Sequence, residues 1–292
     1  MFAAVIPAKN EEKSILAVLT NVLRLPVDYI IPVLNGCTDR TLELIQSIPD
    51  TRLHTIYFTQ PLGIDIPRAI GAVYARHLGV QGVLIVDGDM SGDIQVNLGQ
   101  LLAALDSGTD IALTNCYPYI SHRAKLAQIV LRFRQRLNRE LDYLQTLGLS
   151  TPTHGPHALS ARALNSIPPE AIAVPPLSLV WAHRASLTVK VATSIRHEDL
   201  HSPRKHRRHA RLIAETIMGD CLMGLHLAQN EPVSRTLGHH NLQGYHPERR
   251  FDILRAWEPA ISEENSYFGR HMIVPVWQNH MELKSHNLKL FS

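Results

Sequence analysis

The stretch Val83–Met90 reads VLIVDGDM, an apolar run that stops at two aspartates on either side of a glycine. Runs of branched apolar residues are typical of a strand that is buried on both faces of a parallel sheet. The glycine leaves room for the backbone to approach a ligand. We therefore expect Asp87 and Asp89 to lie at the carboxyl end of a core strand, where open α/β sheets bind their ligands.

Short strand and helix signals alternate on both sides of this stretch. Upstream, apolar runs at Phe2–Ile6, Tyr29–Leu34 and Leu53–Phe58 are separated by apolar residues at helical spacing. Downstream, a helical pattern at Val96–Leu105 precedes a strand pattern at Ile111–Thr114. Because this alternation is typical of βαβ units, we predict an α/β fold. We expect a Rossmann-like, mixed but mostly parallel sheet with helices on both faces.

The pattern is less regular after residue 115. We predict one long amphipathic helix over Arg123–Leu147, a proline-rich loop at PPEAIAVPP (residues 168–176) and a strand over Ser186–Ile195. A second long helix is expected from His206 to about Gln229. We expect residues 1–205 to form the ligand-binding region. Residues 206–292 would form a C-terminal helical extension for packing, for dimerisation or for covering the site.

The positive charge of the chain is concentrated in one segment. The 292 residues carry a formal charge of only +3 and 6% aromatic residues, which argues against a nucleic-acid partner. Arg196–Arg211 carries six Arg or Lys against two acids. Three readings stay open for this segment. It is a solvated helix start, a site for an anionic substrate, or a patch attracted to anionic lipid headgroups or nucleic acid.

The cysteines and the N-terminus indicate the compartment. Cys37, Cys116 and Cys221 are far apart and form no CxxC pair, which favours a reducing compartment. No apolar run reaches the ~18 residues of a membrane span. The first residues, MFAAVIPAKNEE, lack the basic and long apolar regions of a signal peptide. We expect a cytoplasmic protein. Its oligomeric state stays open, and a homodimer is one of the alternatives.

Two further strand ends carry polar turn residues, VIPAKNEE at residues 5–12 and VLNGCTD at residues 33–39. With IVDGDM at residues 85–90 they form three ordered motifs, and over residues 1–115 the chain resembles the family 2 glycosyltransferases with the GT-A fold. This resemblance implies a donor site for a UDP- or GDP-sugar. Arg68 stands in for the lysine-containing loop that the family often has. The implied donor-site residues are Pro7, Ala8, Asn10, Glu11, Asn35, Asp39, Arg68, Asp87 and Gly88.

The DGD segment also suits a metal ion, since paired carboxylates are ligands for hard cations that in turn bind phosphate oxygens. In the family, the DxD motif approaches the diphosphate and the metal, and a histidine after the last core strand is often a third ligand. The resemblance therefore implies Mg²⁺ or Mn²⁺ held by Asp87, Asp89 and His197.

One departure from the family concerns the catalytic base. Ala171–His197 contains no Asp or Glu, although inverting members place their catalytic carboxylate roughly there. We assign no catalytic residue and favour a retaining transferase. A strand followed by His197 and a long helix is similar to the arrangement in the glucosyl-3-phosphoglycerate synthases and related retaining enzymes. A catalytically inactive domain that binds an anionic partner through the basic segment is the alternative.

The sequence does not name the acceptor, and an anionic acceptor is one reading. Arginine forks match phosphate and carboxylate oxygens. Cations near a helix N-terminus are disfavoured by the helix dipole, which suggests that they meet a bound anion. The acceptor or phosphate candidates are His157, Arg204, Lys205 and Arg207.

Overall fold

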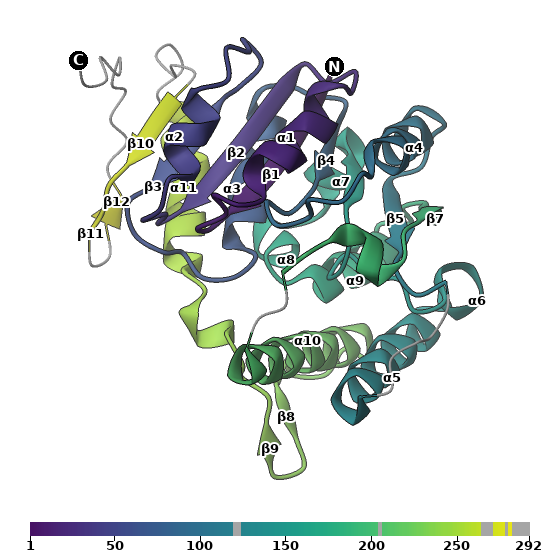
Figure 1. Cartoon of the computed structure of the whole chain (residues 1–292). Helices are drawn as coiled ribbons and strands as arrows, with labels where there is room; N and C mark the ends of the chain where they lie inside the picture. Colours follow the sequence, from purple (N-terminus) through teal and green to yellow (C-terminus); the bar gives the residue numbers. More distant parts are fainter. Residues whose placement is uncertain (119–123, 204–205, 264–270, 278–279, 282–292) are drawn as a thin grey trace.

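The computed structural model of the chain describes residues 1–118, 124–203, 206–263, 271–277 and 280–281 (Figure 1). Within these residues the centre is an eight-stranded sheet of order β10-β3-β2-β1-β4-β6-β5-β7. All neighbours are parallel except that β6 runs antiparallel to β4 and β5, so the predicted mixed, mostly parallel sheet is confirmed. The strands are β1 (Phe2–Ala8), β2 (Tyr29–Asn35), β3 (Thr55–Phe58), β4 (Gly82–Ile85), β5 (Ile111–Asn115), β6 (His157–Ser160), β7 (Val189–Ser194) and β10 (His271–Val274).

Helices cover both faces of this sheet, because side chains of its central strands alternate between two apolar cores. In β1, Ala3 and Val5 belong to one core, and Ala4 and Ile6 belong to the other. The second core lies under α1 (Ile15–Leu23), α2 (Thr41–Gln46) and α4 (Gln95–Asp106). The first lies under α3 (Ile66–His77), α7 (Ala161–Ser166), α8 (Pro169–Ile172), α9 (Pro175–Arg184), α10 (Arg207–Ala228) and α11 (Phe251–Glu263).

Two segments differ from the sequence-based prediction. The helix predicted over residues 123–147, of which residue 123 lies outside the described residues, is interrupted. α5 (Lys125–Glu140) ends before Asp142, whose φ is 58°, and α6 (Leu144–Leu147) follows. The prediction of a proline-rich loop at residues 168–176 is also wrong. Here α8 and α9 each begin with prolines in the first turn, where the missing N–H is not needed.

The C-terminal residues return to the α/β layers. The side chain of Trp257 in α11 is fully buried and donates a hydrogen bond of 3.2 Å to the Ile70 carbonyl in α3. β10 then pairs with β3 at the sheet edge. The remaining elements are η1 (His197–Leu200), β8 (Thr236–Leu237), β9 (His240–Asn241), η2 (His246–Glu248), β11 (Val276–Trp277) and β12 (His280–Met281). No helix in the described part of the chain is long and apolar enough to cross a bilayer.

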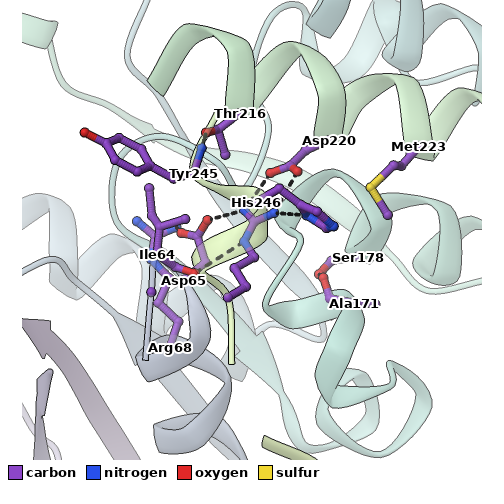
Figure 2. Close-up of polar contacts among 12 residues, drawn as sticks. Ile64, Asp65, Arg68, Ala171, Ser178, Thr216, Asp220, Met223, Tyr245 and His246 are labelled. Carbon is purple, nitrogen blue, oxygen red and sulfur yellow. Dashed lines mark hydrogen bonds and ion pairs between the residues drawn. The ribbon is translucent and has the colours of Figure 1, made fainter. Parts of the chain in front are cut away.

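A cluster of buried ion pairs joins this C-terminal region to α3. Arg249 reaches Asp220 of α10 at 2.7 Å and Asp65, the residue before α3, at 2.8 Å, and Asp220 also pairs with Arg235. In Figure 2 the carboxylates of Asp65 and Asp220 point toward the same guanidinium, that of Arg249. Burial opposes ionisation of Asp220, but Arg249 and Arg235 outweigh it and lower its pKa.

Loss of one charge from this cluster is expected to destabilise the fold strongly. Asp220→Asn leaves two buried guanidiniums short of a counter-charge, so the free energy of unfolding should fall by about 3–5 kcal/mol. Asp252→Asn is the control, since its pair with Arg250 is partly exposed and should contribute less than ~1 kcal/mol. Urea denaturation measures both. Equal losses in the two variants would contradict a structural role for the buried cluster.

His157, the first residue of β6, should make stability depend on pH. It is buried, and burial together with Arg68 lowers its pKa from 6.5 to about 4. Between these values the unfolded chain binds a proton that the folded chain does not, so stability falls as the pH falls. In His157→Gln, the loss of unfolding free energy between pH 7 and pH 5 should be roughly 2 kcal/mol smaller than in the wild type. The control is His239→Gln, at an exposed position, which should lose as much unfolding free energy as the wild type. A wild-type loss in His157→Gln as well would show that His157 is not the source of the pH dependence.

Candidate active site

A cavity of about 560 Å³ opens at the carboxyl ends of β1, β2 and β4. This is the sheet edge at which the sequence analysis placed the ligand. Most of the predicted donor-site residues lie in its wall, together with Asp89. They are Pro7, Ala8, Glu11, Asn35, Arg68, Asp87 and Gly88.

The ends of β1 and β4 meet closely at Gly88. Its backbone N–H donates to the Pro7 carbonyl at 3.0 Å. A Cβ on Gly88 would lie 2.9 Å from the Ala8 Cβ, closer than side-chain carbons approach. Gly88 is therefore required by packing, and it fixes the DGD turn against the end of β1 in the cavity wall.

Asp87 is held by an arginine from the start of α3. Arg68 Nε lies 3.1 Å from Asp87 Oδ1, and Arg68 Nη2 lies 2.5 Å from Asp87 Oδ2. Arg68 Nη1 also lies 3.0 Å from an Asp65 carboxylate oxygen. Burial disfavours the charged guanidinium, but Asp87 and Asp65 outweigh burial and raise the pKa of Arg68. The Asp87 carboxylate is therefore held at both oxygens by one guanidinium, which Asp65 fixes in turn.

Asp89 and His197 belong to loops that pack together. Asp89 Oδ1 accepts a hydrogen bond of 3.3 Å from the Ser202 hydroxyl, and Gly92 N–H donates to the Leu200 carbonyl at 3.1 Å. The His197 ring lies 3.1 Å, Nδ1 to Nε2, from His154, which lines the cavity. The loop that carries His197 is thus fixed against the DGD turn.

The predicted metal ligands do not form a closed protein site. Among the described residues, no three His, Cys, Asp or Glu side chains converge on one point. Asp87 faces Arg68, and His197 faces His154. The donors still fit a hard cation, because Mg²⁺ is commonly bound by one or two carboxylates and completed by substrate phosphates and waters. Asp89, in the cavity wall, is the carboxylate that fits this arrangement best.

Three of the predicted donor-site residues stabilise loops. Asn10 Oδ1 accepts from Thr38 N–H at 2.8 Å, and Asp39 accepts from Glu12 N–H at 3.0 Å, so the loop after β1 is joined to the loop after β2. Asn35 Oδ1 accepts from a backbone N–H at residue 62. Asn10 and Asp39 lie outside the cavity wall, whereas Asn35 lines it.

The acceptor candidates are not gathered in the cavity wall. His157 is buried in β6 and Arg207 is exposed at the start of α10, and neither lines the cavity. Arg204 and Lys205 lie outside the described residues.

A second half of the cavity wall escaped the sequence analysis. It comes from α10 and from the turn around Tyr245, whose hydroxyl lies 2.8 Å from His209 Nδ1. Asp65 and Glu248 also line it. The signal that could have found part of this wall is the spacing of His209, Ile213, Thr216 and Asp220, which places them on one face of α10.

Comparisons with known proteins agree with this geometry. The model of the family "Glycosyl transferase family 2" matches residues 3–166. No match is found among curated protein sequences.

Solved structures of glucosyl-3-phosphoglycerate synthase from Mycobacterium tuberculosis share the fold. One, in complex with Mn²⁺, uridine diphosphate and phosphoglyceric acid, is 17% identical with a TM-score of 0.58, over 80% of this chain and 79% of that one. Another, with Mg²⁺ and uridine diphosphate, is 19% identical with a TM-score of 0.56, over 80% of each chain. The family match covers more than half of the chain, so this protein belongs to glycosyl transferase family 2.

Proposed function

We propose that this glycosyltransferase moves a sugar from a nucleotide diphosphate sugar to an acceptor hydroxyl, with Mg²⁺ or Mn²⁺ at the diphosphate. The observation that carries this proposal is the joint placement of Asp87, Gly88 and Asp89 with the ends of β1 and β2 in one cavity wall. The crystallised relatives described above were complexed with uridine diphosphate and Mn²⁺ or Mg²⁺, which favours a UDP-sugar as the donor.

In this proposal the nucleoside lies against Pro7, Ala8 and Glu11, and the diphosphate lies toward the DGD turn. Asn10 and Asp39 contribute by fixing the two loops that frame the nucleoside. Arg68, itself paired with Asp87 and Asp65, orients the Asp87 carboxylate in the cavity wall. A polar group that is fixed in this way needs no reorganisation during the reaction.

The cation would be held by Asp89, with Asp87 and His197 on the adjoining segments. When bound, a divalent cation neutralises charge on the leaving diphosphate. Neighbouring residues position the side chains that would hold the cation: Ser202 donates a hydrogen bond to Asp89, and His154 contacts the His197 ring. Because the DGD turn is locked by Gly88, the carboxylate is in place before the donor arrives.

We further propose that transfer proceeds with retention of the anomeric configuration. Support comes from Ala171–His197, which contains no carboxylate, and from the pairing of Asp65 and Asp220 with Arg249. Arg249 and Arg235 lower the pKa of Asp220 and make it a poor proton acceptor, and Asp65 is occupied by two arginines. Glu248 is the carboxylate in the second half of the cavity wall for which no ion pair occurs among the described residues, so it is the test case for a base.

The acceptor would occupy the half of the cavity formed by α10 and the Tyr245 turn. Hydroxyl and imidazole groups of Thr216, Tyr245 and His209 line it and suit a polyhydroxyl acceptor. Binding of an anionic acceptor would depend on Arg204 and Lys205. The chain would act in a reducing compartment such as the cytoplasm, in keeping with free thiols at its three cysteines.

The donor site predicts a metal-dependent response to UDP. UDP with Mn²⁺ should raise the melting temperature of the wild type, with a stabilisation of about 2.7 kcal/mol at a hundred times Kd. Asp89→Asn should lose the part of the shift that needs Mn²⁺. Asp93→Asn, at a nearby exposed position, should behave like the wild type. An unchanged Mn²⁺ response in Asp89→Asn would remove Asp89 from the metal site.

Retention can be tested on the first product found in a screen of hydroxyl acceptors. NMR of the anomeric proton should show the configuration of the donor sugar. Glu248→Gln should change kcat by no more than a few fold. An inverted product, together with a fall in kcat of about 10²–10⁴ in Glu248→Gln, would identify Glu248 as a general base and reject retention.

A further inference from the structure

Helix α5 carries a stripe of cations on its outer face. Lys125, Ile129, Arg132, Arg136 and Arg139 are exposed, and their spacing of four and three residues places them on one side of the helix. Ile129 is 41% exposed in the middle of this stripe. None of the four cations makes an ion pair with another residue of the described chain.

Helix α10 extends this surface. Val130 of α5 packs with Ala214 and Met218, and Leu137 contacts Gly224, so the two helices run side by side in the same direction. Their N-terminal turns are therefore adjacent, and the exposed Arg207 and Arg208 continue the positive surface, whereas Arg211 pairs with Glu215 at 2.9 Å. In Figure 1 both helices lie below the sheet, and the β8–β9 hairpin extends beyond α10.

These two helices hold the excess positive charge of the protein. α5 carries five Arg or Lys against one Glu, and α10 carries three Arg against Glu215 and Asp220. Together they have five more positive than negative charges, whereas the whole chain has a formal charge of +3. The remainder of the chain is thus slightly negative, and a negative surface would attract the molecule by this face.

We propose that the outer face of α5 and the first turns of α10 dock on an anionic lipid surface. Clustered Lys and Arg are drawn to acidic headgroups, and apolar side chains within such a cluster enter the boundary between headgroups and acyl chains. Ile129 and Leu126, which is 36% exposed, are placed for this contact. A nucleic acid would use the cations but would gain nothing from the apolar residues.

Docking on this face would bring the cavity close to the lipid. His209 and Ile213, in the first two turns of α10, line the cavity wall. Lipid binding itself needs neither a donor nor a metal, so it does not depend on the proposed reaction.

The test is flotation of the full chain with vesicles of phosphatidylcholine, with and without phosphatidylglycerol. The wild type should bind only the anionic vesicles, and binding should weaken with added salt. The triple variant Ile129→Gln, Arg132→Gln and Arg136→Gln should bind at least tenfold more weakly. Glutamine favours helix, so α5 should persist, which circular dichroism checks.

A matched triple variant removes the same groups elsewhere. Val96→Gln, Lys13→Gln and Arg24→Gln also delete one exposed apolar residue and two exposed cations, around α1 and α4, and should bind like the wild type. Ile129→Gln alone should weaken vesicle binding and leave binding to duplex DNA unchanged. Failure to bind anionic vesicles, equal losses in the two triple variants, or binding to DNA in preference to vesicles would each overturn the proposal.

Discussion

Carboxylates and guanidiniums alternate through the interior from the DGD turn to the C-terminal region, in the order Asp87, Arg68, Asp65, Arg249, Asp220 and Arg235. A buried charge that loses its partner costs several kcal/mol, so no member of this chain of ion pairs can move by itself. These ion pairs join the end of β4, the start of α3, the turn before α11 and the middle of α10. Both halves of the cavity wall are therefore held in one arrangement by the same set of interactions.

Much of the fold and of the donor half of the site could be predicted from sequence because their signals are local. β1 and β4 are apolar on both faces, and parallel strands end at one edge, so Pro7, Glu11, Asp87 and Asp89 had to lie near one another. The contact between Asp65 and Arg249 spans 184 residues, and a single charged residue carries no periodic signal of its partner. Prolines in the 168–176 segment misled because the same residue that breaks a helix also begins one.

Charges in this protein serve two different purposes, distinguished by whether they are paired. Around the cavity, Arg68 and Arg249 each face two carboxylates. These pairs fix the orientation of the side chains and leave little net charge in the cavity wall. On α5, arginines 132, 136 and 139 are exposed and have no counter-ion among the described residues, which suits attraction of a partner at a distance. The small net charge of the whole chain conceals this division.

Anomalous scattering from crystals grown with UDP and Mn²⁺ tests most directly whether the DGD turn binds the diphosphate and the metal. We predict one Mn²⁺ peak between the Asp89 carboxylate and the diphosphate, with the pair of Asp87 and Arg68 intact. A Mn²⁺ peak confined to surface histidines, with UDP bound away from the ends of β1 and β4, would contradict it.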